Sequence, residues 1–267
     1  MNTREPASPP RWKQLADELA AEIADGRYQP GEKLPKIEDL VVAGRGSRTT
    51  VQRAYADLTE RGLTIGIQRV GTVVSPILGK IHRDAMNRYR QARREEGQSR
   101  GAFDTEIRRL GMTPTSRPEI SRGRPPARVA EILGVDGDEP ESVVIRARVM
   151  LADDIVVQLA SSYFPGDIAF GSQLEEQNTG PGGSKSRLAE LGHAQAEITE
   201  TIDVRSPTAE EARGLAIPAE RQVYEITHVA RDAEGRAVEV AVHVVSTTLW
   251  TLSYTWSVDP PGDTPQQ

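Results

Sequence analysis

Three helical patterns separated by glycine-containing turns open the chain, and they constrain its fold more than any other feature of the sequence. They predict helices from Pro10 to Gly26, over about 36–43, and over about 47–61. In the third pattern the apolar residues recur at the spacing of one helix face, at Val51, Ala54, Tyr55 and Leu58. Alternating residues over 63–75 then predict a two-stranded hairpin. Three helices followed by a hairpin are the outline of a winged helix-turn-helix.

The outward face of the third helix has the side chains expected of a DNA-binding helix. Once the apolar face is subtracted, polar residues remain near its N-terminal end: Arg48, Thr49, Gln52 and Arg53. A recognition helix presents its N-terminal residues to the major groove. Residues 1–100 hold 18 Lys and Arg against 13 Asp and Glu, a net +5, whereas the remainder holds 15 against 26, a net −11. We therefore predict that the N-terminal part binds double-stranded DNA.

Composition and motifs exclude several classes of protein. The chain has no cysteine, so disulfides and thiolate zinc sites are absent, and its four histidines never stand at metal-ligand spacing. No apolar run approaches the roughly 20 residues of a membrane helix, and the polar N-terminus lacks the apolar segment of a signal peptide. No serine pairs with a histidine in a recognisable catalytic motif. We expect a cytoplasmic protein with no metal, no cofactor, no contact with a membrane and no catalytic residues.

After residue 100 the predicted secondary structure changes to strands interleaved with short helices. We expect a winged helix-turn-helix over 10–75, a linker over 76–100 and a second domain over 101–258. In the second domain, residues 130–164 and 212–245 repeat a helix end, an extended run, an acidic turn and another extended run. This duplication predicts one α+β domain with pseudo-twofold symmetry. The basic residues of the linker either track DNA phosphates or belong to a solvated connection.

The N-terminal part resembles the GntR family of bacterial regulators. The family's opening signature is similar to residues 26–35, which read GRYQPGEKLP. Its recognition helix and wing are similar to residues 47–51 (SRTTV), to Gly62-Leu63 and to residues 71–74 (GTVV), at the same spacing. The resemblance implies a winged helix that binds an operator as a dimer. The residues that it places at the DNA are Arg48, Thr49, Thr50 and, in the wing, Gly71.

Two departures from the family pattern bear on how DNA is read. The family usually follows Leu-Pro with Ser-Glu-Arg, and its arginine reads a base. Here Lys36-Ile37-Glu38 follows, so Glu38 stands where that arginine falls and Lys36 is left to supply positive charge. A carboxylate near phosphate is unfavourable, although it can accept a hydrogen bond from a cytosine amine. At the wing tip, Arg69-Val70 replaces the usual Gly-Arg pair, so Arg69 is either a DNA contact shifted by one residue or an ordinary exposed arginine.

The acidic half is similar to the UTRA effector-binding domain of the HutC subfamily. The similarity rests on Arg146-Ala147-Arg148, on Gly182-Gly183-Ser184 before a helix that ends at Leu191-Gly192, and on residues 235–239, which read GRAVE. It implies an α+β fold similar to chorismate lyase, with a mixed or antiparallel sheet that binds a small-molecule effector. The all-helical effector domain of the FadR type does not suit the Val-rich alternating runs.

Candidate effector-binding residues follow from strand geometry and from this resemblance. Arg146 and Arg148 are two apart on a strand and so leave the same face, where they either hold a carboxylate or phosphate or solubilise an exposed sheet. Glu239 and His243 also share a face; the resemblance places Glu239 at the family position that touches the ligand, whereas a structural role suits His243 better than a binding role. The remaining candidates are Ser162, Tyr163, Ser184 and Ser186. The last two lie near a helix start, where serines bind an anion or simply cap the helix.

The resulting hypothesis is a dimeric repressor whose small, anionic effector alters the spacing of two DNA-binding heads on a palindromic operator. Two regulatory roles remain as alternatives. One is that of a metabolite sensor, and the other is that of a plasmid-transfer or antibiotic-pathway repressor without a sugar-phosphate effector. The alternative class of protein is a lyase-like enzyme fused to a winged helix, and detectable turnover of an aryl ether or ester would support it.

Overall fold

The computed structural model describes residues 9–67, 70–78, 80–85, 88 and 101–256, and the chain divides into two compact units, 1–80 and 81–267. Part of the segment 76–100, which we expected to be a linker, is a β-strand. Ile81–Asp84 forms strand β3, which pairs in parallel with β10 (Trp250–Ser253) and so belongs to the second unit. No local pattern in the sequence predicts this strand, because its partner lies near the other end of the chain.

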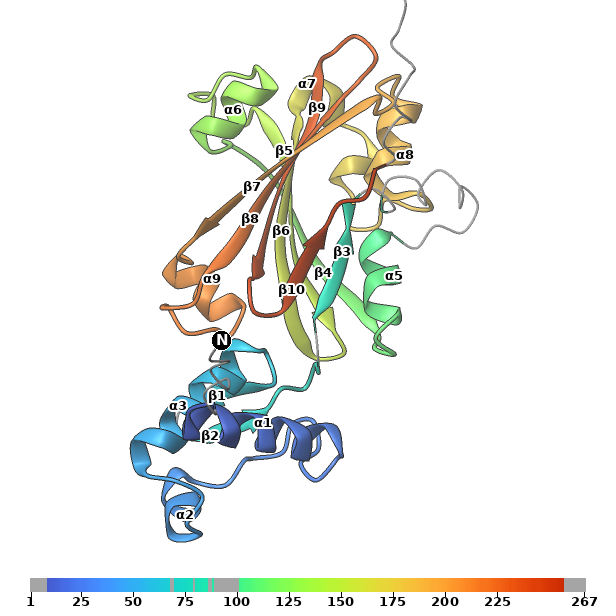
Figure 1. Ribbon diagram of the computed structural model, residues 1–267. Helices are drawn as coiled ribbons and strands as arrows, with labels where there is room; N and C mark the ends of the chain where they lie inside the picture. The colour runs from blue at the N-terminus through green and yellow to red at the C-terminus, as the bar shows by residue number, and fades with distance from the viewer. Residues whose placement is uncertain (1–8, 68–69, 79, 86–87, 89–100, 257–267) are drawn as a thin grey trace, which may run out of the picture. The chain divides into compact units, whose positions relative to one another are not determined.

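The N-terminal unit has the predicted three helices and hairpin (Figure 1). Its elements are α1 (Arg11–Ala24), α2 (Ile37–Val42), α3 (Arg48–Glu60), β1 (Thr64–Ile67) and β2 (Gly71–Val74). Its core joins all three helices to the wing through Leu15, Leu19, Leu40, Val51, Leu58 and Val74. Each such side chain stabilises the unit by about 1.5–3 kcal/mol when buried. Val41 is 37% exposed, because Leu40 takes the inward position of this short helix.

The second unit is built on a six-stranded antiparallel sheet with the strand order β4-β5-β6-β9-β8-β7 (Figure 1). Its strands are β4 (Pro114–Gly123), β5 (Val143–Ala152), β6 (Ile155–Pro165), β7 (Glu197–Arg205), β8 (Val223–Arg231) and β9 (Ala237–Ser246). Its helices are α5 (Ala102–Arg108), α6 (Ala127–Leu133), α7 (Gly166–Ala169), α8 (Gly183–Glu190) and α9 (Ala209–Gly214), with a 3-10 turn η1 (Gln173–Glu175). The predicted α+β fold is confirmed.

The order of the strands repeats one structural unit from each edge of the sheet inward. A strand, a helix and a hairpin follow one another as β4-α6-β5-β6 and again as β7-α9-β8-β9. The two hairpins meet where β6 pairs with β9, from Leu159↔Val244 to Tyr163↔Val240. The duplication that the sequence predicted is therefore visible in the topology, and it extends by one edge strand on each side.

Different helices cover the two faces of the sheet. We call the α8 face the one on which α7, η1 and α8 pack, through Ile168, Leu174 and Leu188. We call the α6 face the opposite one, which α6 and α9 cover through Val129 and Leu215. Residues opposite one another in the register share a face. This rule assigns every strand residue of the candidate site to one face or the other.

Candidate DNA interface and effector site

The N-terminal end of α3 is fixed by its cap. Ser47 is its N-cap, and the Ser47 hydroxyl accepts a hydrogen bond from the Thr50 backbone N–H at 3.2 Å. The Thr50 hydroxyl lies 2.9 Å from the same oxygen. Thr50 is half-buried and engaged in the cap, whereas the other candidates on the helix are exposed: Arg48, Thr49, Gln52 and Arg53. The structure thus brings four side chains to a free helix face and turns a fifth toward the helix start.

Glu38 is not isolated, because it forms an ion pair with Arg48. Glu38 Oε1 lies 2.9 Å from Arg48 Nη1, and both side chains are exposed. The pair joins the first turn of α2 to the first turn of α3. An exposed pair of this kind is worth about 0.2–1 kcal/mol, so DNA phosphate can compete for the arginine. Lys36, just before α2, is exposed as well.

The wing contributes one described candidate. Gly71 is exposed and has a φ of +112°, a conformation that residues with a side chain rarely adopt. The backbone at the base of the wing is tied to the loop after α1 by a bridge between Lys33 and Val73. Arg69, the predicted wing-tip contact, lies outside the described residues.

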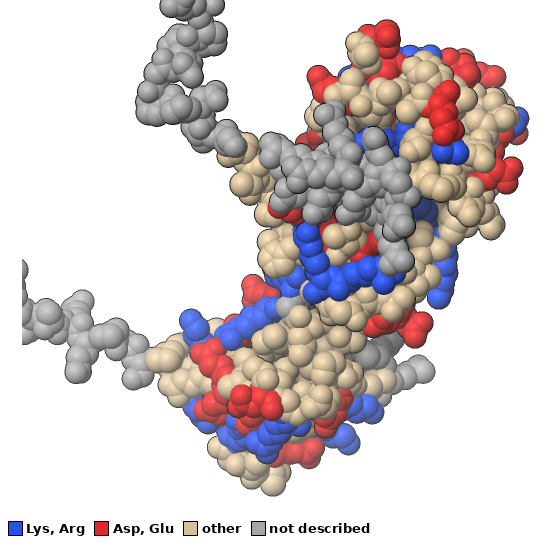
Figure 2. Space-filling view, turned by 90° about the vertical axis from the view of Figure 1, so that its right-hand side faces the viewer, with Lys and Arg blue, Asp and Glu red and all other residues tan. Residues whose placement is uncertain are grey.

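Charges on the N-terminal unit are mixed in space. In Figure 2 its Lys and Arg side chains lie among Asp and Glu side chains and do not form one continuous basic surface. The exposed cations around α3 are accompanied by the carboxylate of Glu38. With a modest net charge and interspersed carboxylates, attraction to DNA phosphates alone gives weak binding. DNA binding by this unit would therefore also depend on contacts that α3 makes in the groove.

Replacing Glu38 by Gln is expected to raise the affinity for a random-sequence duplex by about 2- to 5-fold at low salt. The change removes a negative charge beside the exposed N-terminal end of α3, and with it the repulsion that this charge exerts on phosphate. Fluorescence anisotropy at several salt concentrations measures the affinity. Glu60→Gln, at the exposed C-terminal end of α3, removes the same charge elsewhere and serves as the matched control. Equal shifts in both variants would contradict a local role for Glu38.

On the α8 face, Arg146 is anchored to the main chain. Its Nη1 donates to the carbonyl oxygen of Leu174 at 2.8 Å and to that of Glu176, and its Nη2 donates to that of Gln177 at 3.1 Å. The residue is 6% exposed, and burial together with the nearby Arg148 lowers its pKa. Arg146 therefore fastens the segment after η1 to the sheet.

Arg148 lies on the same face, as predicted, but its guanidinium is only partly satisfied. Its Nη2 donates to the Ser162 hydroxyl at 2.7 Å, while its buried Nε finds no partner in the described part of the chain. Burial lowers the pKa of Arg148, against a weaker opposing effect of Glu239. A buried cationic donor without an acceptor is costly, so this position favours an anionic ligand.

Glu239 and His243 also lie on the α8 face. Glu239 accepts a hydrogen bond from Gln195 Nε2 at 2.8 Å. The Nδ1 of His243 lies 3.2 Å from Gln158 Nε2. Burial first, and nearby cations second, hold the pKa of His243 well below its usual value, so its imidazole is neutral. Ser184 and Ser186 are half-buried on the first two turns of α8, whose N-cap is Gly182.

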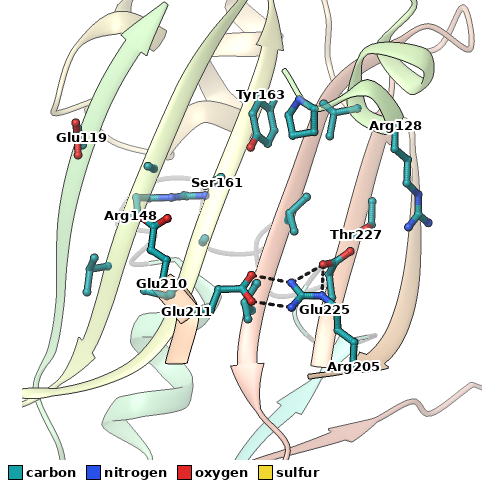
Figure 3. A pocket seen from close by; sticks show the side chains of 18 of the residues that line it. Glu119, Arg128, Arg148, Ser161, Tyr163, Arg205, Glu210, Glu211, Glu225 and Thr227 are labelled. Atoms are coloured by element: carbon teal, nitrogen blue, oxygen red, sulfur yellow. Dashed lines mark hydrogen bonds and ion pairs between the residues drawn. The ribbon is translucent and has the colours of Figure 1, made fainter. Parts of the chain in front are cut away.

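Tyr163 does not join this group. It pairs in register with Ile145 and Val240, whereas its neighbour Ser162 pairs with Arg146 and Ala241, so the two side chains leave opposite faces. Tyr163 lines a groove of about 490 Å³ on the α6 face (Figure 3). The expectation that Ser162 and Tyr163 line one site is wrong, because consecutive strand residues alternate.

The groove on the α6 face was not foreseen. Its polar part is dominated by Arg205, whose guanidinium is held by Glu211 at 2.6 Å and by Glu225 at 2.6 Å (Figure 3). The groove floor is apolar and includes Leu159, Val242 and Val244. Since the carboxylates satisfy Arg205, no unpaired charge is directed into this groove from that network.

Two stretches of the chain match known families. Residues 12–74 match the family described as bacterial regulatory proteins, gntR family, and residues 109–248 match the UTRA domain. The chain belongs to the GntR family. Its similarity to an uncharacterized HTH-type transcriptional regulator of Streptomyces coelicolor, 34% identical over 258 residues and 93% of each chain, supports the same membership. This GntR-family protein is a transcriptional regulator with a DNA-binding winged helix and a UTRA effector domain.

Other relatives and solved structures agree with this assignment. The HTH-type transcriptional repressor NagR of Bacillus subtilis is 28% identical over 171 residues, which is 63% of each chain. The crystal structure of PhnF from Mycobacterium smegmatis shares the fold, with a TM-score of 0.56, 21% identity and coverage of 92% of this chain and 100% of that one. In the part of the GntR-family chain that the structure describes, no helix is long and apolar enough to cross a membrane, and no group of three or more His, Asp or Glu residues is placed to hold a metal ion.

Proposed function

We propose that this GntR-family chain is an effector-responsive repressor that binds a palindromic operator as a homodimer. The effector part rests on one observation, the buried Nε of Arg148 that lacks an acceptor within the described residues. An anionic small molecule supplies that acceptor at low cost, because the guanidinium is already desolvated and oriented by Ser162. The site binds its ligand without turning it over.

Repression and dimerisation are supported by relatives and by symmetry. NagR of Bacillus subtilis is named a repressor, and so is the histidine utilization repressor of Klebsiella aerogenes, 31% identical over 74 residues. One recognition helix reads only a short half-site, so two copies related by a twofold axis gain specificity from a palindrome. The protein acts in the cytoplasm, where bacterial DNA lies.

The residues of each site keep distinct roles in this proposal. At the DNA, Arg48, Thr49, Gln52 and Arg53 face the groove, Thr50 helps to cap α3, and the contacts at the edges come from Lys36, Glu38, Gly71 and Arg69. At the effector, Arg148 is the anion-binding residue, and its surroundings are Ser162, Ser184, Ser186, Glu239 and His243. Arg146 positions the segment after η1 through its bonds to main-chain oxygens.

Selection from a random duplex pool tests the DNA-binding part. The purified chain is expected to enrich a short inverted repeat and to bind it as two chains per duplex, as measured by light scattering on the complex. Enrichment of asymmetric sites bound by a single chain would overturn the homodimer.

A screen tests the effector part. Small anions that weaken binding to the selected duplex in the wild type should lose this effect in Arg148→Gln, while Arg122→Gln, which removes an exposed arginine paired with Glu175, should behave as wild type. An anion that still releases DNA from Arg148→Gln would refute the role of Arg148.

A further inference from the structure

Arg83 is a buried arginine in the strand that begins the second unit. It lies on β3, opposite Leu252 of β10, and is 1% exposed. Its Nη2 forms an ion pair with Glu200 of β7. Its Nε and Nη1 are also buried, and neither has a hydrogen-bond partner among the described residues. Unpaired donors on a buried cation carry a desolvation cost that nearby acceptors normally offset.

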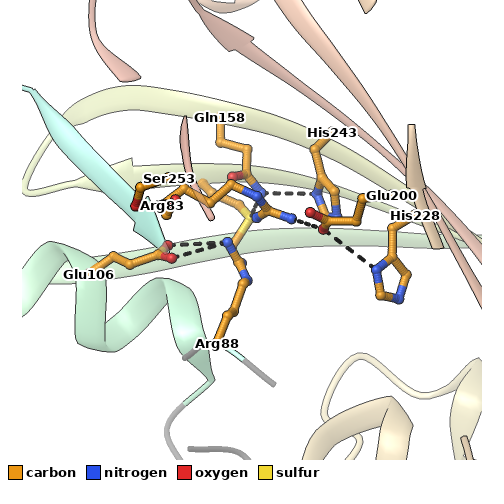
Figure 4. Close-up of polar contacts among 9 residues, drawn as sticks. Arg83, Arg88, Glu106, Gln158, Glu200, His228, His243 and Ser253 are labelled. Atoms are coloured by element: carbon orange, nitrogen blue, oxygen red, sulfur yellow. Dashed lines mark hydrogen bonds and ion pairs between the residues drawn. The ribbon is translucent and has the colours of Figure 1, made fainter. Parts of the chain in front are cut away.

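Arg83 is paired directly with Glu200 and interacts with Glu106 only at longer range. Figure 4 shows it facing Gln158 and His243 as well as Glu200. Glu200 is shared with His228, whose Nδ1 lies 3.7 Å away. The other acid labelled in Figure 4 is Glu106 of α5, and its carboxylate forms an ion pair with Arg88 at 3.2 Å. The donors on Nε and Nη1 therefore have no hydrogen-bond acceptor among the described residues.

Arginines outnumber glutamates in the group of side chains around Arg83 and Arg148, which the half-buried Asp84 adjoins. The group contains four arginines and three glutamates, a difference of one, in the described part of the chain: Arg83, Arg88, Arg146 and Arg148 with Glu106, Glu200 and Glu239. Burial raises the pKa of Glu106, against weaker opposing effects of Arg88, Arg83 and Arg109. Neutral His243 adds no compensation. Buried guanidinium nitrogens without an acceptor are stabilised by an anion from outside.

His243 on the α8 face is the common neighbour of Arg83 and Arg148. Arg148, Ala160 and His243 form one row in the register across β5, β6 and β9. Both arginines, and Arg88, act electrostatically on His243. The small side chain of Ala160 stands between Arg148 and His243, and Ala241 is the next small residue on the same face. The unpaired nitrogens of Arg83 and Arg148 thus belong to the same part of the α8 face as the small or neutral side chains of Ala160, Ala241 and His243.

We propose that Arg83 is a second anion-binding residue of the effector site, so that the site takes a short molecule with an anionic group at each end. This rests on the proposed function, in which Arg148 binds one anionic group. The other group accepts hydrogen bonds from Nε and Nη1 of Arg83, and the neutral middle of the molecule lies along Ala160 and His243. The ends are carboxylates or phosphates, since both match a guanidinium.

Isothermal titration of the full-length protein with matched small acids tests this proposal. The probes are succinate, glutarate and adipate, butyrate as a single-anion control of similar size, and 3-phosphoglycerate to separate a phosphate end from a carboxylate end. The variant is Arg83→Lys, which keeps the charge and the ion pair with Glu200 but lacks the donors on Nε and Nη1. Arg122→Gln is the control.

We expect a two-ended acid to bind the wild type at least about 10-fold more tightly than butyrate, and Arg83→Lys to lose that preference while binding butyrate unchanged. Wild type without preference for two-ended acids, or a preference that survives Arg83→Lys, would overturn the proposal. Loss of binding to every acid in Arg148→Gln supports the proposed function separately. If Arg148→Gln binds all acids normally, the proposal that Arg148 binds the effector is wrong. The comparison of Arg83→Lys with wild type still decides the role of Arg83.

Discussion

Replacing Trp250 by alanine is expected to destabilise the second unit by about 3–5 kcal/mol. Trp250 is fully buried, and its indole Nε1 donates to the carbonyl oxygen of Val157 at 2.8 Å. It is the first residue of β10 and pairs with Ile81 of β3. The truncation leaves a large cavity and an unpaired main-chain oxygen at the point where β10 meets the six-stranded sheet. For a unit of this size the loss corresponds to a melting temperature lower by roughly 6–20 °C.

Trp256 offers a control of the same residue type. It is 67% exposed, so Trp256→Ala should change the melting temperature by less than about 2 °C. Scanning calorimetry measures both variants, because the two units of the chain can unfold in separate transitions. A similar small effect for both tryptophans would mean that β10 is not held to the sheet by Trp250. The position of Arg83 on the neighbouring strand would then lose its support.

The N-terminal unit could be predicted closely because its signals are local. Ser47 is a residue type that favours the N-cap position it takes at α3, and Val51 and Leu58 take the inward positions that their spacing indicates. The pair between Glu38 and Arg48 could not be predicted, since it depends on the angle at which α2 meets α3. Sequence spacing alone does not fix that angle.

In the second unit the central strands were predictable and the edge strands were not. The β5–β6 and β8–β9 hairpins are Val-rich and alternate, whereas the edge strands β4 and β7 carry many polar residues, and β4 includes Pro118. Proline and charge are what exposed edge strands tolerate, so their strand signal is weak. Strand β3 was hidden for another reason: it is stabilised by β10, from the far end of the chain.

For the effector site, the two-residue period of a strand was the most reliable guide. It placed Arg146 and Arg148 on one face correctly, and the same rule would have separated Ser162 from Tyr163. It could not show that main-chain oxygens satisfy Arg146 while Arg148 keeps an unpaired nitrogen. Hydrogen bonding between distant segments decides which arginine is free, and it appears only when the chain is folded.

Arg48→Ala is expected to weaken binding to the selected operator by about 10- to 100-fold, which is the usual cost of losing a side chain that reads a base edge. Arg48 begins α3 and is exposed, and among the described residues its guanidinium is held by the ion pair with Glu38. The fold should be unaffected, because the residue has no part in the core.

The salt dependence of this loss distinguishes the two kinds of contact that an arginine makes with DNA. If Arg48 reads a base, the affinity for the operator falls while that for a random duplex changes little. If it binds phosphate, both affinities fall together and the slope of log affinity against log salt becomes shallower by about one. Arg27→Ala, which removes an exposed charge from the loop after α1, is the matched control. Since Glu38 orients Arg48 from the side, we expect base reading, and an operator affinity that Arg48→Ala leaves unchanged would show that α3 is not the recognition helix.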